Sequence, residues 1–504
     1  MAIAFRVDAS LQIGTGHFMR CLTLADALKQ LGARTRFVSR HMPEHLRGML
    51  AARGHEFEQL TSIPRDGLGD LSHSHWLGIS QAADAQDSIK ALSDRAWEWL
   101  VVDHYALDAQ WETALRNTAR RILVIDDIAN RQHDCDVLLD QNLYADMETR
   151  YARKVPKHCQ LLLGPRYALL RDEFRQLRAQ AKPKAGPVKS MFVFFGGVDA
   201  DNHTGRVIEA LAKIDVPGLH VDVVIGALHS CREQVEIQCA QYGFACHVQT
   251  DQMAKLIAAA DLAVGAGGSV TWERCCLGLP TLTICVSGNQ SEQITDAACE
   301  GLLYAPELKG ELSLMVRRHV SALMESCHLR YSISRNGMQA VDGRGVMRVV
   351  GSLGCGKVEI RVATPDDSPK LFEWRNHPAI RSVSRSTGLI NWESHQKWLA
   401  SVLADSGKVL LVGQRQGLPV GVVRFDIRGD EAEVSIYLIP GVKLSGQGQD
   451  LLRSAEQWFS SNHPEVYKVC AHVLGGNERS QRLFLDAGYQ VESTFYSKRL
   501  ASNG

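Results

Sequence analysis

The chain has 504 residues, more than one hydrophobic core usually supports, so we expect two or three domains. Its 56 Lys and Arg residues balance 56 Asp and Glu residues, which removes the basic field of a nucleic-acid binder and favours a small-molecule ligand. The 13 cysteines form no Cys-x-x-Cys pair and no apolar run could span a membrane, so we predict a cytoplasmic protein with reduced thiols, no metal and no membrane partner.

Residues 1–180 alternate apolar strands with amphipathic helices, which predicts a parallel, doubly wound sheet. The first strand is followed by a glycine-rich turn, Gly14-Thr15-Gly16-His17, that opens a helix near position 17. Glycines let the backbone approach a ligand, and a helix start favours an anionic leaving group. Because an imidazole can take a proton from water near neutral pH, we predict that His17 is a catalytic base for hydrolysis or group transfer.

Further residues in and around this turn are predicted substrate contacts. They are Arg6, Asp8, Ser10, Gly14, Gly16 and Arg20. Asp103-His104-Tyr105 and Asp126-Asp127 also end strands and could orient substrate or water, although such aspartates are equally often helix caps. The alternative for His17 is a capping or core histidine in a plain turn, and the polar residues crowded beside it count against that alternative.

A second alternating series occupies residues 188–350, after a Pro- and Lys-rich connection, and predicts a second Rossmann-like lobe. Its Gly267-Gly268-Ser269 turn could bind a diphosphate, and Glu273 could accept both ribose hydroxyls. Asn289, Gln290 and Gln293 follow the next strand and could meet the ligand from the opposite side. The alternative is a plain turn followed by an acid that the helix dipole favours.

A third domain is predicted at residues 357–504, after a glycine-rich stretch, residues 351–357, that we expect to lack regular structure. Strands in its middle and helices around 392–403 and 449–459 fit a small α+β acyltransferase. The strand that contains Leu438 leads into Lys443-Leu444-Ser445-Gly446-Gln447-Gly448, a glycine-rich loop suited to pyrophosphate. The alternative for this loop is an ordinary tight turn. Asn477, farther along the chain, favours the pyrophosphate loop over that alternative.

The first lobe resembles the UDP-sugar hydrolases of the pseudaminic-acid pathway, the PseG family, through the run Arg6-x-Asp8-x-Ser10-x-x-Ile13-Gly14-x-Gly16-His17-x-x-Arg20-Cys21. The resemblance implies a two-lobed glycosyltransferase B fold, with His17 activating water against the anomeric carbon. It also implies a UDP site at Gly268, Ser269 and Glu273, with Asn289, Gln290 and Gln293 near the sugar and phosphates. Spore-coat polysaccharide proteins share parts of this pattern.

The third domain resembles GNAT N-acetyltransferases, since Lys443-x-x-Gly446-x-Gly448 is similar to their pyrophosphate loop and Asn477 to their pantetheine contact. This resemblance implies acetyl-CoA as co-substrate, held by Leu438, Lys443, Gly446, Gln447, Gly448 and Asn477. Five residues resemble the substrate half of the PseH type: Arg375, Asn376, Arg381, His395 and Trp398. Where many relatives carry a tyrosine acid this chain has Phe484, and Tyr437 and Tyr496 are possible substitutes.

Together the two resemblances imply one bifunctional enzyme of pseudaminic acid biosynthesis. The third domain would acetylate the 4-amine of UDP-4-amino-4,6-dideoxy-N-acetyl-β-L-altrosamine. The lobes would then hydrolyse UDP-2,4-diacetamido-2,4,6-trideoxy-β-L-altropyranose to the free sugar and UDP, and association with other sugar-pathway enzymes is possible. Two alternatives stay open: a glycosyltransferase of the same fold fused to an acetyltransferase, and a nucleotide-sugar-binding scaffold.

Overall fold

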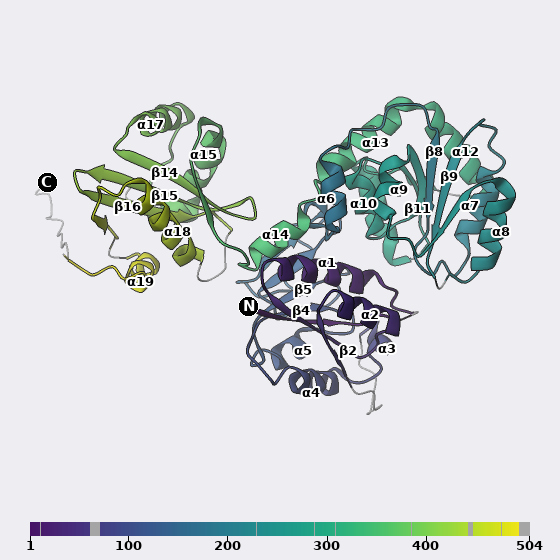
Figure 1. Ribbon diagram of the computed structural model, residues 1–504, viewed down its shortest axis with the longest axis horizontal. Helices are drawn as coiled ribbons and strands as arrows, with labels where there is room; N and C mark the ends of the chain where they lie inside the picture. Colours follow the sequence, from purple (N-terminus) through teal and green to yellow (C-terminus); the bar gives the residue numbers. More distant parts are fainter. Residues whose placement is uncertain are drawn as a thin grey trace, which may run out of the picture. The chain divides into compact units, whose positions relative to one another are not determined.

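The computed structural model describes residues 1–10, 12–60, 71–227, 229–286, 288–307, 309–384, 386–441, 447–474 and 476–492. The chain divides into two compact units, Met1–Val349 and Val350–Gly504. The first unit contains two parallel sheets and the second contains one mixed sheet (Figure 1). No helix in the described part is long and apolar enough to cross a membrane.

The first lobe is built on a seven-stranded parallel sheet with the order β3-β2-β1-β4-β5-β6-β7. Its strands are β1 (Ala2–Val7), β2 (Arg34–Ser39), β3 (Glu56–Gln59), β4 (Trp97–Asp103), β5 (Ala119–Ile125), β6 (Val137–Asp140) and β7 (Gln160–Leu163). The direction in which strands are added reverses between β1 and β4. Ligands of open α/β sheets bind outside the carboxyl ends of the strands at such a reversal, so this edge is the candidate site.

Helices cover both faces of this sheet. They are α1 (Gly16–Gln30), α2 (Glu44–Ala52), α3 (Ser74–Leu77), α4 (Gln81–Ala91) and α5 (Ala109–Ala114). In Figure 1, α1 lies on one side of β4 and β5, whereas α4 and α5 lie on the other. Helix α1 buries Phe18 and Leu22, with Cys21 between them at 0% exposure, and this packing fixes the rotation of α1 and with it the direction of His17.

The second lobe repeats the plan with the order β10-β9-β8-β11-β12. Its strands are β8 (Ser190–Phe194), β9 (His220–Ile225), β10 (Ala245–Val248), β11 (Leu262–Ala266) and β12 (Thr281–Ile284). Its helices include α7 (His203–Leu211), α8 (Arg232–Tyr242), α9 (Met253–Ala259), α10 (Val270–Cys276), α11 (Ser291–Cys299), α12 (Leu312–Glu325) and α13 (Cys327–Ala340). The reversal here lies between β8 and β11, which places the Gly267-Gly268-Ser269 turn at the corresponding edge.

The segments between and after the lobes are also helical in part. Residues Pro165–Tyr167 (η1) and Asp172–Arg178 (α6) precede the second lobe, and Phe174 of α6 is buried in that lobe's core with Trp272. Helix α14 (Gly345–Ser352) extends into the glycine-rich stretch expected to lack regular structure, so that expectation is wrong at its first two residues.

The second unit is a five-stranded sheet with the order β13-β14-β15-β16-β17. Its strands are β13 (Glu359–Val362), β14 (Lys408–Arg415), β15 (Leu418–Arg428), β16 (Glu431–Leu438) and β17 (Lys468–Ala471), and only the β16–β17 pair is parallel. Its helices are α15 (Ser368–Asn376), α16 (Pro378–Arg381), α17 (Trp392–Ala404), α18 (Gln447–Asn462) and α19 (Glu478–Asp486). Helices α15 and α17 cover one face, and α18 covers the other (Figure 1).

The expected fold class is confirmed in its architecture: two Rossmann-like lobes with parallel sheets are followed by an α+β domain. The alternation of apolar strands and amphipathic helices determined this outcome, because each parallel strand requires a covering helix as its crossover.

Candidate active sites

His17 lies at the point where the first sheet reverses, and a carboxylate orients it. Its Nδ1 is 2.6 Å from Oδ1 of Asp103, the last residue of β4, and its side chain is 11% exposed. Because a carboxylate can only accept a hydrogen bond, Nδ1 carries the proton and Nε2 is left to accept one. The geometry therefore fits a general base whose tautomer Asp103 fixes.

Arg20 completes this cluster from the next turn of α1. Its Nε and Nη2 donate to the two carboxylate oxygens of Asp103 at 2.6 and 2.7 Å, and Nη1 donates to Asp127 at 3.0 Å. Burial by itself would raise the pKa of Asp103, but the charge of Arg20 and the hydrogen bonds from Arg20 and His17 outweigh it and hold that pKa well below its usual range. Asp103 is therefore ionised at every physiological pH.

Aromatic rings form one wall beside His17. The Tyr105 ring packs edge-on against the imidazole at 4.7 Å, and Trp76 of α3 lies 6.1 Å from the imidazole and stacks on Tyr105 at 5.5 Å. Tyr105 also donates its hydroxyl to Asp127. The sequence did not indicate Trp76, because a lone tryptophan after His73 and His75 carries no motif. Asp103, Tyr105 and Asp127 were recognisable as polar residues at strand ends.

Arg6 and Asp8 lie beneath the site and form an ion pair with each other, and Arg6 also forms one with Asp84. Arg6 donates to both oxygens of Asp8 and to both oxygens of Asp84 at 2.7 to 3.1 Å, and its side chain is 1% exposed. Asp8 also accepts hydrogen bonds from Ser39 and from the backbone N–H of Arg40. Arg6 and Asp8 therefore stabilise the end of β1. A ligand could contact them only if the surrounding side chains rearranged.

The glycine turn is closed by a side chain. Ser10 Oγ accepts hydrogen bonds from the backbone N–H groups of Gln12 and Ile13, and Gly14 adopts φ +75°, a conformation that favours glycine. A Cβ at Gly14 or Gly16 would meet no described atom within 4 Å, so the space next to both glycines is open. Ser10 therefore shapes the turn, and the two glycines keep the start of α1 accessible.

In the second lobe, the Gly267-Gly268-Ser269 turn joins β11 to α10. Gly268 adopts φ +85°, and a Cβ at Gly267 would lie 2.7 Å from Ile294, so both positions require glycine. Glu273 is one turn into α10 and lies 3.7 Å from Arg171. Burial raises the pKa of Glu273, and the nearby Arg171 partly opposes this shift.

Gln290 and Gln293 lie close to the same turn. A Cβ on Gly268 would be 3.5 Å from Gln290 Nε2, and Gln290 Oε1 is buried with no hydrogen-bond partner among the described residues. Gln293, on α11, is 4% exposed. The side chain of Asn289 lies outside the described part. The unpartnered Gln290 oxygen next to a glycine turn fits a place where a ligand donates a hydrogen bond.

A hydrogen bond joins the two lobes behind these sites. The indole N–H of Trp272, directly before Glu273 in α10, donates to Asn142 Oδ1 at 2.9 Å, and Asn142 Nδ2 donates to Asp127 at 3.2 Å. Trp272 is fully buried and Asn142 is 6% exposed. A continuous polar chain therefore connects α10 to Arg20 and His17, which neither residue's sequence context indicated.

In the second unit, the predicted cofactor residues lie around the start of α18 and the end of β16. The last pair between β16 and β17 is Val434 with Ala471. From there to Leu438, where β16 ends, no described strand pairs with β16 on the β17 side. Gln447 and Gly448 open α18, whereas Lys443 and Gly446 lie outside the described residues. Asn477 caps α19, accepting a hydrogen bond from the backbone N–H of Ser480 at 3.2 Å.

The predicted substrate half has its residues on one face of the sheet, that of α15 and α17. Arg375 donates to Ser384 at 2.9 Å, and Asn376 exchanges two hydrogen bonds with the backbone of Ile390. His395 is 2% exposed and donates from Nε2 to the carbonyl of Ser368, so in this structure it supports α15. Trp398 is 40% exposed, and Arg381 ends α16.

The possible general acids differ in what the structure describes. Phe484 is buried in the core against Tyr489, and Tyr496 lies outside the described residues. Tyr437 lies on β16 and packs in the same cluster as Trp374 of α15. Burial raises the pKa of Tyr437, so its hydroxyl keeps its proton.

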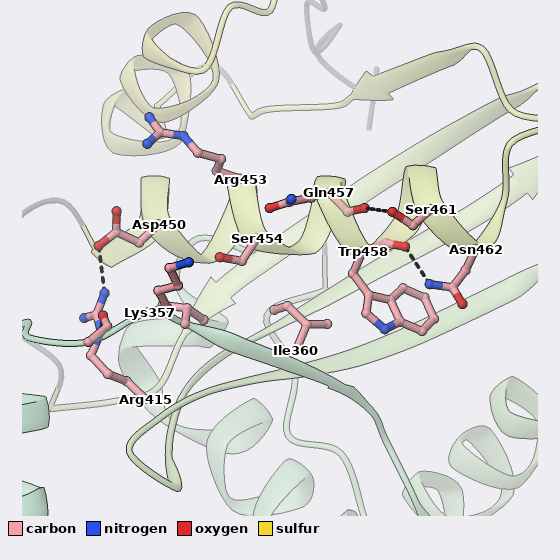
Figure 2. Close-up of a pocket in the computed structure, with 12 residues that line it drawn as sticks. Lys357, Ile360, Arg415, Asp450, Arg453, Ser454, Gln457, Trp458, Ser461 and Asn462 are labelled. Atoms are coloured by element: carbon pink, nitrogen blue, oxygen red, sulfur yellow. Dashed lines mark hydrogen bonds and ion pairs between the residues drawn. The ribbon is translucent and has the colours of Figure 1, made fainter. Parts of the chain in front are cut away.

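A groove of about 570 Å³ lies elsewhere in this unit, between β13 and α18 (Figure 2). Lys357, Ile360 and Trp458 contribute to its lining, and Arg415 donates to Asp450 at 2.7 Å at one end. Of the predicted acetyl-CoA residues that the structure describes, Leu438, Gln447, Gly448 and Asn477, none lines it. No group of three or more metal-ligating side chains is found in the part of the chain that the structure describes.

Comparison with known proteins gives both parts of the chain a relationship. Residues 357–490 match the acetyltransferase (GNAT) domain. A UDP-2,4-diacetamido-2,4,6-trideoxy-beta-L-altropyranose hydrolase of Campylobacter jejuni is 26% identical over 219 residues, which cover 43% of this chain and 68% of the hydrolase. The spore coat polysaccharide biosynthesis protein SpsG of Bacillus subtilis is 23% identical, covering 70% of this chain and 98% of that protein.

One relative matches over both parts. An uncharacterized protein of Methanocaldococcus jannaschii is 21% identical over 512 residues, or 97% of each chain. The N-terminal region is thus related to the hydrolase and to the spore coat protein, and the C-terminal part is a GNAT domain, which implies acetyl-CoA as co-substrate. Both relationships indicate an enzyme.

Proposed function

We propose that the N-terminal lobes hydrolyse a UDP-linked 2,4-diacetamido-2,4,6-trideoxy sugar of the altrose type, and that the GNAT domain makes the corresponding diacetamido compound. The observation that carries the hydrolase proposal is the His17–Asp103 pair at the reversal of the first sheet. The name of the Campylobacter jejuni relative supports the identity of the sugar. The acetylated product of the GNAT domain would then be the substrate that the N-terminal lobes hydrolyse.

In the proposed hydrolysis, water is the nucleophile. His17 Nε2 accepts a proton from water as its oxygen bonds to the anomeric carbon, and the bond from that carbon to the diphosphate oxygen breaks, releasing UDP. Asp103 stabilises the imidazolium that forms, and Arg20 holds Asp103 in position. The Gly267-Gly268-Ser269 turn and Glu273 bind the UDP. Arg6 and Asp8 act from below by holding the end of β1.

In the proposed acetylation, a neutral 4-amine attacks the thioester carbonyl of acetyl-CoA, the C–S bond breaks and an amide forms. The CoA thiolate takes a proton from Tyr437, and the Tyr437 phenolate regains a proton by way of water as the new amide nitrogen gives its own proton up. Unpaired backbone groups at the end of β16, up to Leu438, would accept and donate hydrogen bonds to the pantetheine arm, as an added strand does. Lys443, Gly446, Gln447 and Gly448 would bind the pyrophosphate, with Asn477 beside the arm. Arg375, Asn376, Arg381 and Trp398 would line the sugar side.

The experiment is to incubate the full chain with acetyl-CoA and the 4-amino UDP-sugar, without any sugar acceptor, and to follow the products by mass spectrometry. We expect free CoA, the diacetamido sugar and UDP. Acetylation without UDP release would contradict the hydrolase and favour a glycosyltransferase that needs an acceptor. Neither CoA nor UDP release with this substrate would favour a nucleotide-sugar-binding scaffold.

Two substitutions localise the hydrolysis. His17→Ala should abolish UDP release, and Asp103→Asn should lower its kcat by about 100-fold or more because the wrong tautomer is then favoured. Acetylation should be unchanged in both variants, since its site lies in the other unit. Loss of both activities in a folded variant would contradict the assignment of two independent centres.

A further inference from the structure

The second lobe contains a buried arginine whose charge is unpaired in the structure. Arg274, on α10, is 1% exposed, and no carboxylate among the described residues lies within ion-pair distance of it. Its Nη2 donates to the carbonyl of Ala266 at 2.6 Å and contacts Thr271 Oγ1 at 3.4 Å. Its Nε and Nη1 are buried without any hydrogen-bond partner among the residues that the structure describes.

The position of the guanidinium is next to the glycine turn. Ala266 is the last residue of β11 and directly precedes Gly267. A Cβ on Gly265 would lie 2.7 Å from Arg274 Nη1 and 2.3 Å from the carbonyl oxygen of Phe194 at the end of β8. Glycine at 265 therefore makes room for the guanidinium, which lies beneath the adjacent ends of β8 and β11, where the second sheet reverses.

An isolated buried charge is expensive, so it needs a compensating partner. Arg330 is another fully buried arginine of this lobe with no ion pair to a described carboxylate. It donates hydrogen bonds to three backbone carbonyls, those of Leu323, Met324 and Gly186. Arg274 has only one such strong contact. Burial lowers the pKa of Arg274 to about 10, which leaves it charged at neutral pH. The missing partner is therefore an anion.

We propose that Arg274 is a fixed positive charge that selects the diphosphate of the nucleotide ligand, acting from beneath the Gly267-Gly268-Ser269 turn. The inference rests on the proposed UDP site in this lobe. Because the guanidinium is shielded from solvent, its field at the turn is poorly screened, and it needs no rearrangement when the ligand arrives. The uridine portion of the ligand would gain nothing from this charge.

The test compares two ligands that differ by the diphosphate group. Dissociation constants of UDP and of uridine are measured by calorimetry and ligand-observed NMR on the full chain and on Arg274→Met, which keeps an unbranched apolar stem and removes the guanidinium. We expect UDP affinity to fall about tenfold or more. Uridine affinity should change by less than about threefold, since a single charge–dipole contact is small.

Further variants separate charge from folding. Arg274→Lys keeps the charge and should retain most of the preference for UDP over uridine. If Arg274→Met does not fold, Arg274→Gln, which is neutral but can still donate a hydrogen bond to the Ala266 carbonyl, replaces it in the comparison. Arg330→Met removes an equally buried arginine and should lower thermal stability without changing the ratio of the two dissociation constants.

Each outcome decides the question. Equal weakening of UDP and uridine in Arg274→Met, unchanged UDP binding in that variant, or a Lys variant with no preference for UDP would overturn the role of Arg274 alone. If the unaltered chain binds neither UDP nor uridine, the proposed UDP site fails and the inference fails with it.

Discussion

At the residue scale, His17 depends on a partner 86 positions away in the sequence. Asp103 fixes its tautomer, and Arg20 occupies both oxygens of that carboxylate, which leaves Asp103 no freedom to turn away. Arg20 was predicted to contact the substrate directly. In the structure its donors go to Asp103 and Asp127, so its charge acts on the site chiefly through these carboxylates.

Tyr437 carries the residue-scale prediction for the acetyltransferase. Tyr437→Phe should lower kcat for CoA release by about 100-fold with little change in KM for acetyl-CoA, because it removes only the proton donor to the thiolate. The measurement is thiol release under saturating substrates. As a control, Tyr489→Phe removes a buried hydroxyl that bonds to Glu456, and it should leave kcat unchanged. Full activity of Tyr437→Phe would rule this acid out.

At the element scale, α10 serves two sites at once. Its first turn contains Trp272 and Glu273, and the indole of Trp272 bonds to Asn142, just after β6 of the other lobe. A shift of α10 would therefore reach Asp127 and Arg20 through two further hydrogen bonds. This contact fixes the position of the Gly267-Gly268-Ser269 turn relative to His17.

Trp272→Phe tests this connection. Because the buried Asn142 oxygen loses its donor, we expect the free energy of unfolding to fall by about 1–3 kcal/mol, and kcat for UDP release to fall as well. Denaturant titration and steady-state kinetics measure the two effects. Trp111→Phe is the matched control, since it also loses a buried indole hydrogen bond, to Asp84. The control should lose stability but keep kcat, and equal kinetic effects would argue against a link through α10.

At the scale of the whole molecule, the two compact units differ in how they hold their charges. Among the buried carboxylates of the first unit, Asp8, Asp84, Asp103 and Asp126 are at most 1% exposed and lie beside arginine or histidine residues. Burial alone would raise the pKa of each, but adjacent arginine and histidine residues outweigh burial and lower all four. In the second unit, the carboxylates with lowered pKa values, such as Asp367 and Asp405, are more exposed and better screened.

This difference predicts that acid unfolds the first unit before the second. A carboxyl group whose pKa is lower in the folded state stabilises the fold above its unfolded pKa near 3.9, and this stabilisation is lost as pH falls towards the folded value. We therefore expect stability of the first unit to decline below about pH 5. Hydrogen exchange resolved by peptide should lose protection first in β1, β4 and β5. Earlier loss in β14 to β16 would contradict the prediction.

Local patterns in the sequence were sufficient for the architecture and for one candidate residue of each site. Strand and helix periodicity set the fold class, and the glycine turns marked His17 and the Gly268 region, because a turn that needs glycine is a local property. The polar residues at strand ends, Asp103 and Asp127, were visible as candidates for the same reason.

Only the tertiary structure decided which of these residues meet. Strand order brings β1 beside β4, so that Asp103 reaches His17, and it turns Arg6 and Asp8 inward to Asp84. The contact of Trp272 with Asn142 and the unpaired charge of Arg274 also have no local signature. Hydrogen bonding and burial depend on neighbours that are distant in the chain, and packing of the folded sheets selects those neighbours.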